Sequence, residues 1–339
     1  YSNLSFNLFA QILKSFLAAF SPAACSDSSM TTPAEWLRSS PRGAYTCIRV
    51  AIAATAAAPA APTTITIHQI EAHVSRLASS CCPAFNGDRD GKASVLTAAV
   101  EIAVEASARA WLTQRRRKHD AHGDVAEWCL MVTVLLPDAA ADAADLRVHC
   151  TPMPTVTGGA CVALRRGTRE DALRKRSTWL DARRPLEAHR VDGVTEVVML
   201  DARGRALEGL VSNLFVIRRG ALYTARGDVL HGTARALVLD ACAAAVPPLP
   251  VHFGAPRARR GGETESESES DGRAPRSLDE WDEAFLTSVV KLVQPIVEVR
   301  INDGVETTTT RVLPIGALTL RLLAAVQTRL AAERDELND

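Results

Sequence analysis

The sequence predicts a chain of mixed α+β class with two domains, and three observations lead to this prediction. The first half carries a long helical pattern at 93–117 between runs typical of strands. The second half is richer in strands, most of them joined by turn sequences typical of hairpins. The length of 339 residues is sufficient for two domains of ordinary size. Because hairpins join antiparallel strands, we do not expect a doubly wound parallel sheet.

A smaller α/β domain is expected at 41–152. Residues 1–40 are left out of it, since the start of the chain is poor in charge and compatible with a targeting peptide or with a stretch that has no role in the fold. In the helix at 93–117, apolar residues recur at helical spacing, and basic residues follow at the C-terminal end, where cations suit the helix dipole. The other elements expected here are strands at 48–53, 64–67, 128–136 and 146–150 and a helix at 70–79.

A second domain is expected at 159–335, after an interdomain linker at 153–158 that is marked by prolines and a Gly-Gly pair. Within it, the run 254–278 is polar, charged and without periodicity, which predicts a disordered insertion. Strands are expected at 194–200, 213–217, 221–224 and 283–290, and helices at 232–245 and 317–334.

The composition excludes several classes of function. Lys plus Arg equals Asp plus Glu, 39 each, so the charge balance gives no argument for nucleic acid or for an anionic membrane. No apolar run approaches the roughly 20 residues that a bilayer requires. The eight cysteines show no Cys-x-x-Cys pair and no spacing typical of a metal site. We therefore expect free thiols in an intracellular protein, with the cytoplasm favoured over a plastid or mitochondrion.

Three short segments could carry chemistry. Lys175 lies in Leu-Arg-Lys-Arg-Ser and taken alone is an ordinary surface lysine, but a lysine that attacks an aldehyde needs neighbouring positive charge or desolvation to lose its proton. Glu208 precedes a glycine and an apolar strand, and a carboxylate held there could pair with a protonated pyridine nitrogen. Gly232-Thr233 opens a helix, whose free N–H groups suit a phosphate, although helix capping alone also explains Thr233.

In their order along the chain, these segments resemble the class IV, fold-type IV pyridoxal-phosphate enzymes, which include branched-chain aminotransferases, D-amino-acid aminotransferases and 4-amino-4-deoxychorismate lyases. The resemblance covers roughly 43–325 and is strongest at 172–235, which is similar to the plant-type D-amino-acid-aminotransferase-like proteins. It implies a smaller α/β N-terminal domain, a larger C-terminal domain with a barrel-like sheet, pyridoxal 5′-phosphate between them, and a homodimer. The ordered series comprises Lys175, Trp179, Arg184-Pro185-Leu186-Glu187, Val194-Thr195-Glu196-Val197 and Leu-Glu-Gly-Leu-Val-Ser-Asn-Leu-Phe at 207–215.

The resemblance implies roles residue by residue. Lys175 matches the family's Schiff-base lysine, which also moves a proton between the substrate Cα and the cofactor's C4′. Glu208 matches the partner of the pyridine nitrogen, and Arg76, in His-x-x-Arg-Leu, matches the arginine that binds the phosphate. Tyr45 matches an aromatic residue near the substrate. The remaining cofactor-binding positions are Leu230 on the ring, and Gly232, Thr233, Thr287 and Ser288 at the phosphate.

The implied activity is transfer of an amino group between an amino acid and a 2-keto acid. Arg49 is a further candidate for the substrate site, because a guanidinium can bind a carboxylate. A lyase of the aminodeoxychorismate type is the nearest alternative. A non-catalytic relative that acts as a scaffold is another, because Ala234 and Val289 replace hydroxyl residues that relatives carry near the phosphate, and because the insertion is long and acidic.

Overall fold

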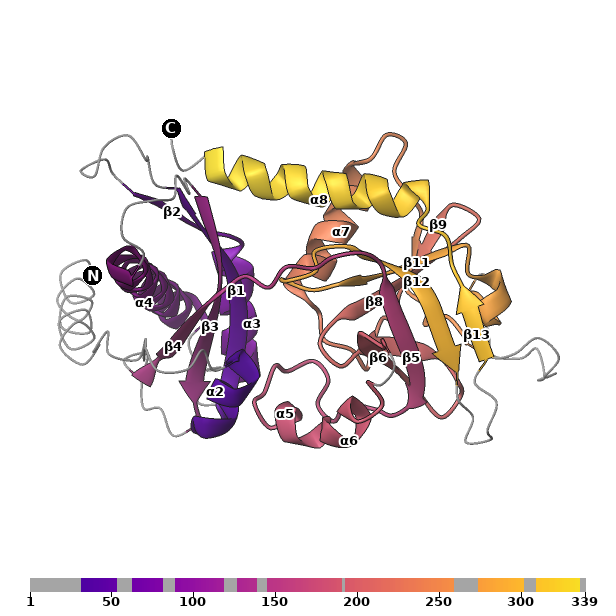
Figure 1. Ribbon diagram of the computed structural model, residues 1–339, viewed down its shortest axis with the longest axis horizontal. Coiled ribbons are helices and arrows are strands. Elements are labelled where there is room, and N and C mark those ends of the chain that lie inside the picture. The colour runs from indigo at the N-terminus through magenta and orange to yellow at the C-terminus, as the bar shows by residue number, and fades with distance from the viewer. Residues whose placement is uncertain are drawn as a thin grey trace. The chain divides into compact units, whose positions relative to one another are not determined.

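The structure is a computed structural model of the chain (Figure 1). It describes residues 32–53, 63–81, 89–118, 127–138, 145–190, 193–258, 274–301 and 309–335. The chain forms two compact units. The first comprises the described parts of Tyr1–Pro154, Arg174–Asp181 and Glu333–Asp339, and the second those of Thr155–Leu173 and Ala182–Ala332. Helices and strands mix in both units, so the predicted α+β class is confirmed.

The first unit is an antiparallel sheet covered by helices. Its strands lie in the order β2 (Thr64–Ile67), β1 (Gly43–Ala53), β3 (Glu127–Pro137) and β4 (Arg147–Pro152), and its helices are α2 (Pro33–Ser39), α3 (Ile70–Ser80) and α4 (Arg89–Lys118). Successive side chains of a strand point to opposite faces, so Ile48, Val50 and Ile52 of β1 share one face. That face packs against α3 and α4 in a buried core.

Helix α2 lies in the segment that was left out of the prediction. Thr32 and Glu35 form a capping box, in which the Glu35 backbone N–H donates to Thr32 Oγ1 and the Thr32 N–H donates to the Glu35 carboxylate. Pro33 follows the cap, where its missing N–H costs nothing. The residues before Thr32 lie outside the described part of the chain.

In the second unit, six of the described strands close into a ring. The order β8-β11-β12-β5-β6-β7 returns to β8, because β7 also pairs with β8. The neighbours of β5 in this ring, β6 and β12, both run parallel to it. The ring strands are β5 (Ala160–Arg166), β6 (Glu196–Leu200), β7 (Ala206–Gly209), β8 (Asn213–Arg218), β11 (Glu283–Thr287) and β12 (Gln294–Ile301).

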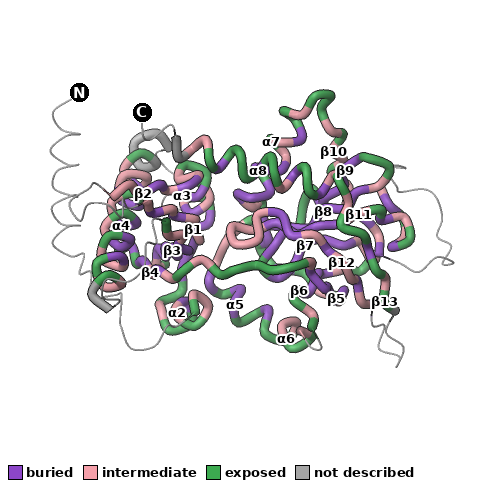
Figure 2. The backbone as a smooth tube through the Cα atoms, turned by 45° about the horizontal axis from the view of Figure 1, so that its top comes forward, coloured by how far each residue is buried: buried purple, intermediate pink, exposed green. Residues whose placement is uncertain are grey.

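The remaining elements of this unit extend and cover the ring. Strands β9 (Ala221–Tyr223), β10 (Val251–His252) and β13 (Thr309–Val312) extend it. Helices α7 (Thr233–Ala244) and α8 (Ala317–Asp335) share a core with β8 and β11, and short helices occur at α5 (Trp179–Ala182), α6 (Arg184–Glu187) and Leu278–Glu280. Figure 2 shows the strands of the ring as largely buried. No helix in the described ranges is long and apolar enough to cross a bilayer.

Three expectations need correction. The strand expected at 283–290 ends at Thr287, because Ser288 begins a turn in which its Oγ accepts from the Lys291 N–H. The insertion expected at 254–278 is ordered at both ends, where the Arg257 N–H donates to the Pro275 carbonyl and Ala258 is buried. Its middle, 259–273, lies outside the described residues. Several strands were not expected at all, namely β5, β7, β10, β12 and β13.

Candidate active site

Lys175 lies beside the first residues of β1. The backbone N–H of Tyr45 donates to the Lys175 carbonyl at 2.9 Å, and the N–H of Ser177 donates to the Gly43 carbonyl at 2.9 Å. Strand β3 pairs with one edge of β1 along its whole length, whereas β2 pairs with the other edge only from Val50 onward. The segment that carries Lys175 therefore occupies the part of this edge that β2 leaves open.

The side chain of Lys175 extends over the ring of Tyr45. Its Nζ lies 4.8 Å from the ring centroid, a distance at which the ring face attracts an ammonium group. The ring is buried against Leu37, Leu135 and Leu180, so its position is fixed by packing. The structure thus brings together the predicted catalytic lysine and one of the two predicted substrate residues.

Ser80, the last residue of α3, connects Lys175 to Arg76. The backbone N–H of Lys175 donates to Ser80 Oγ at 2.9 Å, and this hydroxyl donates to the Arg76 carbonyl at 2.7 Å. Arg176 adds a second link, since its Nη1 donates to the Ser80 carbonyl at 3.2 Å. The lysine is therefore held to the end of the helix that presents Arg76.

The guanidinium of Arg76 is positioned by two buried polar side chains. Its Nη2 donates to Thr46 Oγ1 at 2.7 Å and lies 3.2 Å from His73 Nδ1, while Thr46 Oγ1 lies 2.8 Å from the same nitrogen. Burial, followed by the positive charges of Arg76 and Lys175, holds the pKa of His73 well below its usual value. The imidazole is therefore neutral, and because an arginine can only donate, Nδ1 is the acceptor.

Arg49, the other predicted substrate residue, lies four residues after Tyr45 on the same face of β1, about 13 Å along the strand. Its Nη1 donates to Cys129 Sγ at 3.2 Å. Arg49 is thus positioned by β3 and is not brought beside Lys175 and Tyr45.

In the second unit, Glu208, Asn213 and Thr287 form a row across three neighbouring strands. Glu208 on β7 is directly opposite Asn213 on β8, and Asn213 is directly opposite Thr287 on β11. Directly opposite residues project from the same face of a sheet. Asn213 Nδ2 donates to Glu208 Oε2 at 3.2 Å. We call these three buried residues the polar row.

Leu230 and Gly232 lie against this row. The Leu230 N–H donates to Glu208 Oε2 at 2.9 Å, and the Leu230 carbonyl accepts from Asn213 Nδ2 at 2.7 Å. A Cβ on Gly232 would lie 2.4 Å from Asn213 Oδ1, so only glycine fits. Gly232 is the N-cap of α7 and Thr233 is its first residue, and no side-chain hydrogen bond caps this helix.

Two buried arginines lie near the Glu208 carboxylate. Arg169 Nη1 is 3.7 Å from Glu208 Oε1, and both side chains are almost fully buried. Burial lowers the pKa of Arg235, and the charge of Glu208 opposes that shift. Positive charge beside a carboxylate favours its ionised form, so this surrounding suits a carboxylate that must pair with a protonated ring nitrogen.

Thr287 and Ser288 have different surroundings. The Thr287 hydroxyl is buried without a hydrogen-bond partner among the described residues, whereas Ser288 Oγ accepts from the Lys291 N–H at 3.1 Å. A buried hydroxyl normally has a partner. Together with the uncapped start of α7, the Thr287 hydroxyl fits a phosphate, and Glu208 fits a protonated pyridine. The side chains present are therefore suited to pyridoxal phosphate.

Sequence reasoning missed several residues of these sites. Asn213 stands within the motif at 207–215 without a predicted role of its own, and its position between a strand-end carboxylate and an apolar strand is the signal that could have found it. Thr46 and Ser80 carry no such signal, since their partners are distant in sequence or are backbone groups. Within the described ranges, no group of three His, Cys, Asp or Glu residues is placed to hold a metal ion.

A family model described as amino-transferase class IV matches residues 66–299, which is more than half of the chain. The chain belongs to the class IV aminotransferase family. This class IV aminotransferase is accordingly a pyridoxal-phosphate-dependent enzyme. A search of curated proteins found no match to its sequence.

Solved structures agree with this assignment at the level of the fold. The branched-chain aminotransferase of Thermoproteus uzoniensis, solved with norvaline, has a TM-score of 0.56 at 19% identity, over 87% of this chain and 88% of that chain. A fold IV transaminase from Curtobacterium pusillum has a TM-score of 0.56 at 20% identity, over 91% of each chain. The branched-chain aminotransferase of Escherichia coli has a TM-score of 0.52 at 16% identity, over 86% of each chain. The class IV aminotransferase therefore has the fold-type IV architecture predicted from its sequence.

Proposed function

We propose that this class IV aminotransferase moves an amino group between a small amino acid and a 2-keto acid, with Lys175 as the catalytic residue. The observation that carries the proposal is the placement of Lys175. Its Nζ lies over the Tyr45 ring, and its backbone is bonded to Ser80 at the end of the helix that bears Arg76. A lysine held in this way has a defined position from which to transfer a proton.

The cofactor, when bound, supplies an aldehyde that receives the amino group and a ring that takes up electron density from the substrate Cα. Lys175, as the free amine, takes the proton from Cα and returns it to the acceptor carbon. The ammonium group formed in between is stabilised over the face of Tyr45.

We further propose the following assignments for the binding groups. Glu208 pairs with the protonated pyridine nitrogen and Leu230 packs on the ring, an arrangement supported by the Leu230 N–H that holds Glu208 Oε2. The phosphate is bound by Thr287 and by the start of α7 at Gly232 and Thr233, and the turn at Ser288 supports this site. Arg76 is assigned to the phosphate because the family resemblance implies it. Tyr45 contacts the substrate, and Arg49 is left out of this assignment because the structure does not bring it beside Lys175 and Tyr45.

The role of Lys175 is tested by where the cofactor attaches. Reduction of the cofactor-loaded enzyme with borohydride, followed by peptide mass analysis, should place the added mass on Lys175. Lys175→Ala should lose the visible absorbance of the bound cofactor, whereas Lys118→Ala, at the end of α4, should keep it. Cofactor mass on another lysine, or an unchanged Lys175→Ala spectrum, contradicts the proposal.

The substrate is identified by measuring the half-reaction, in which the amino acid converts the bound cofactor. Amino acids of both chiralities are mixed with the cofactor-loaded enzyme while its spectrum is followed, and the proposal expects conversion with small amino acids. The similarity of 172–235 to plant-type D-amino-acid-aminotransferase-like proteins supports including D-amino acids. Release of pyruvate from aminodeoxychorismate without an amino acceptor would instead indicate a lyase. Protein that stays colourless with added cofactor would indicate a non-catalytic scaffold.

We also propose that the enzyme is a cytoplasmic homodimer, because the family resemblance suggests the dimer and the free thiols suggest a reducing compartment. Sedimentation equilibrium is expected to give twice the chain mass of 36.3 kDa. A monomer at micromolar concentration would contradict the dimer, and recovery of the protein in an organelle fraction would contradict the location.

A further inference from the structure

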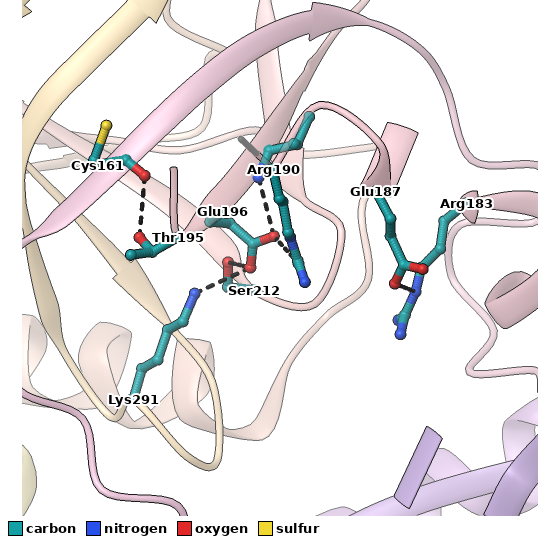
Figure 3. A network of polar contacts seen from close by, with 9 residues as sticks. Cys161, Arg183, Glu187, Arg190, Thr195, Glu196, Ser212 and Lys291 are labelled. Carbon is teal, nitrogen blue, oxygen red and sulfur yellow. Dashed lines mark hydrogen bonds and ion pairs between the residues drawn. The ribbon is translucent and has the colours of Figure 1, made fainter. Parts of the chain in front are cut away.

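A second buried carboxylate, Glu196 at the start of β6, belongs to the same unit as the polar row. Figure 3 shows its polar contacts. Arg190 Nη2 lies 2.6 Å from its Oε1, and Lys291 Nζ lies 3.0 Å from its Oε2. Ser212 Oγ donates to the same Oε2 at 3.0 Å. Glu196 is 0% exposed, and although burial acts to raise its pKa, Lys291 and Arg190 outweigh burial and hold the pKa below its usual value.

Such a network is not explained by stability alone. Two charges removed from water regain in attraction about what they lose in hydration, and apolar side chains of similar volume often serve as well. A buried carboxylate with several hydrogen-bond partners fixes the positions of those partners. We therefore ask which segments Glu196 joins.

Those segments lead to both ends of the polar row. Ser212 directly precedes Asn213, which holds Glu208. Gly209 directly follows Glu208, and a Cβ there would lie 2.5 Å from Ser212 Oγ and 2.9 Å from Glu196 Cγ, so the backbone after Glu208 packs on the Glu196 side chain. At the other end, the Lys291 N–H bonds to Ser288 Oγ in the turn that follows Thr287.

We propose that Glu196 is a positioning residue that holds the two ends of the polar row in register for the cofactor. Through Ser212 it fixes Asn213 and hence the carboxylate of Glu208, and through Lys291 it fixes the turn that begins at Ser288 and hence the hydroxyl of Thr287. The inference rests on the proposed function, in which Glu208 meets the ring and Thr287 the phosphate. Glu196 itself acts through these neighbours.

The test compares two ligands that differ only in the phosphate. The cofactor-free enzyme is titrated with pyridoxal phosphate and with pyridoxal, and the ratio of the two dissociation constants measures the contribution of the phosphate end. In Glu196→Gln the amide keeps the shape but loses the charge that attracts Lys291, so the preference for the phosphorylated ligand should fall at least about tenfold, the loss expected for one well-placed charged hydrogen bond.

Two variants test the contact of Glu196 with Lys291 and its contact with Ser212 separately. Lys291→Met should reduce the preference for pyridoxal phosphate as Glu196→Gln does, because it frees the turn after Thr287. Ser212→Ala should weaken the binding of both ligands by a similar factor and leave their ratio unchanged, because it loosens only the ring end. A purely structural role of Glu196 would lower the melting temperature without changing the ratio.

Asp201→Asn is the matched control. Asp201 follows the opposite end of β6, its carboxylate accepts from Arg205 Nε at 2.6 Å, and its pKa is also lowered. This control should leave the ratio at the wild-type value. An unchanged ratio in Glu196→Gln, or one equal to that of Asp201→Asn, overturns the inference.

If Glu196→Gln does not fold, the ratio of dissociation constants in Lys291→Met tests the inference by itself. This variant is expected to fold, since the Lys291 side chain lies nearer the surface. A wild-type ratio in that variant overturns the inference as well. If the wild-type enzyme bound both ligands equally, the proposed phosphate site itself would be wrong. The failure of the proposed function is thus distinguishable from the failure of the inference about Glu196.

Discussion

The backbone N–H of Lys175 donates a hydrogen bond to Ser80 Oγ at 2.9 Å, across 95 positions of sequence. The same hydroxyl donates to the Arg76 carbonyl. One small side chain therefore ties the proposed catalytic lysine to the helix that bears the proposed phosphate ligand. The Ser80 hydroxyl thus fixes the Lys175 backbone, and with it the position of the amine, through a contact that does not involve the amine itself.

Ser80→Ala should destabilise the protein by about 1–3 kcal/mol, because the Lys175 N–H loses its acceptor. It should also slow the half-reaction about tenfold or more, because the lysine is less well placed. Ser79→Ala is the control, since Ser79 also donates to the Arg76 carbonyl but is exposed. Urea denaturation and stopped-flow absorbance measure the two effects. Equal behaviour of the two variants would show that the link to Lys175 is unimportant.

His73 predicts a pH dependence of stability. Its folded pKa is held well below the usual 6.5, so below that pH the unfolded chain binds a proton that the folded chain does not. The contribution of neutral His73 to the free energy of unfolding should therefore be fully present above pH 6.5. It should be lost as the pH falls from there toward the folded pKa. The slope from this residue is at most about 1.4 kcal/mol per pH unit.

Denaturation of wild type and His73→Gln between about pH 5.5 and 7 measures this slope, since carboxylates with lowered pKa values act mainly at lower pH. The variant should show a flatter dependence. His231→Gln, at an exposed position, is the control for the substitution itself. Parallel curves for wild type and His73→Gln would mean that His73 titrates alike in both states.

Gly232→Ala should disturb the polar row. The new Cβ would lie 2.4 Å from Asn213 Oδ1, so Asn213 would have to move away from Glu208 and from the Leu230 carbonyl. We expect a loss of about 1–3 kcal/mol in stability together with weaker cofactor binding. Gly227→Ala introduces the same methyl where nothing lies within 4 Å, and should change stability by about 0.5 kcal/mol or less. Thermal unfolding and cofactor titration of the pair decide the outcome.

Glu208→Gln should slow the half-reaction by about a hundredfold or more, because a neutral amide cannot offset the charge on a protonated pyridine. The protein should remain folded, since the amide can still accept from the Leu230 N–H. Glu298→Gln, which alters an ion pair with Arg300 on β12, should react at the wild-type rate. Single-turnover rates that stay unchanged in Glu208→Gln would remove this residue from the ring site.

The sequence predicted the parts of the fold that carry a clear period. The pattern at 93–117 corresponds to α4, and the run at 128–136 to β3. Strand β5 was missed because Ala160–Arg166 is a short apolar run without alternation, buried between two parallel neighbours, and such runs have no distinctive period. The first residues of β1 were missed for a related reason, since Gly43–Thr46 are buried without alternation.

The site was predictable only where chemistry shows in residue type and order. Lys175 and Glu208 stand out through their place in an ordered series, whereas nothing in the sequence shows that Ser80 holds Lys175, and Asn213 is marked only by its position before an apolar strand. These two residues act by short hydrogen bonds to groups that the fold brings together. Arg169 was missed for the same reason, because the fold and not the order of the sequence places it beside Glu208.

The closed ring of strands has a consequence for how the protein is made. Strand β5 pairs with β12, with Val162 opposite Val299, so the ring cannot close until β12 has left the ribosome. Pairing over such a separation is slow. Until then one edge of β5 remains open to other nascent chains, and a product truncated before Gln294 would keep it open permanently. Aggregation during synthesis, rather than loss of activity, is the expected fate of such truncated chains.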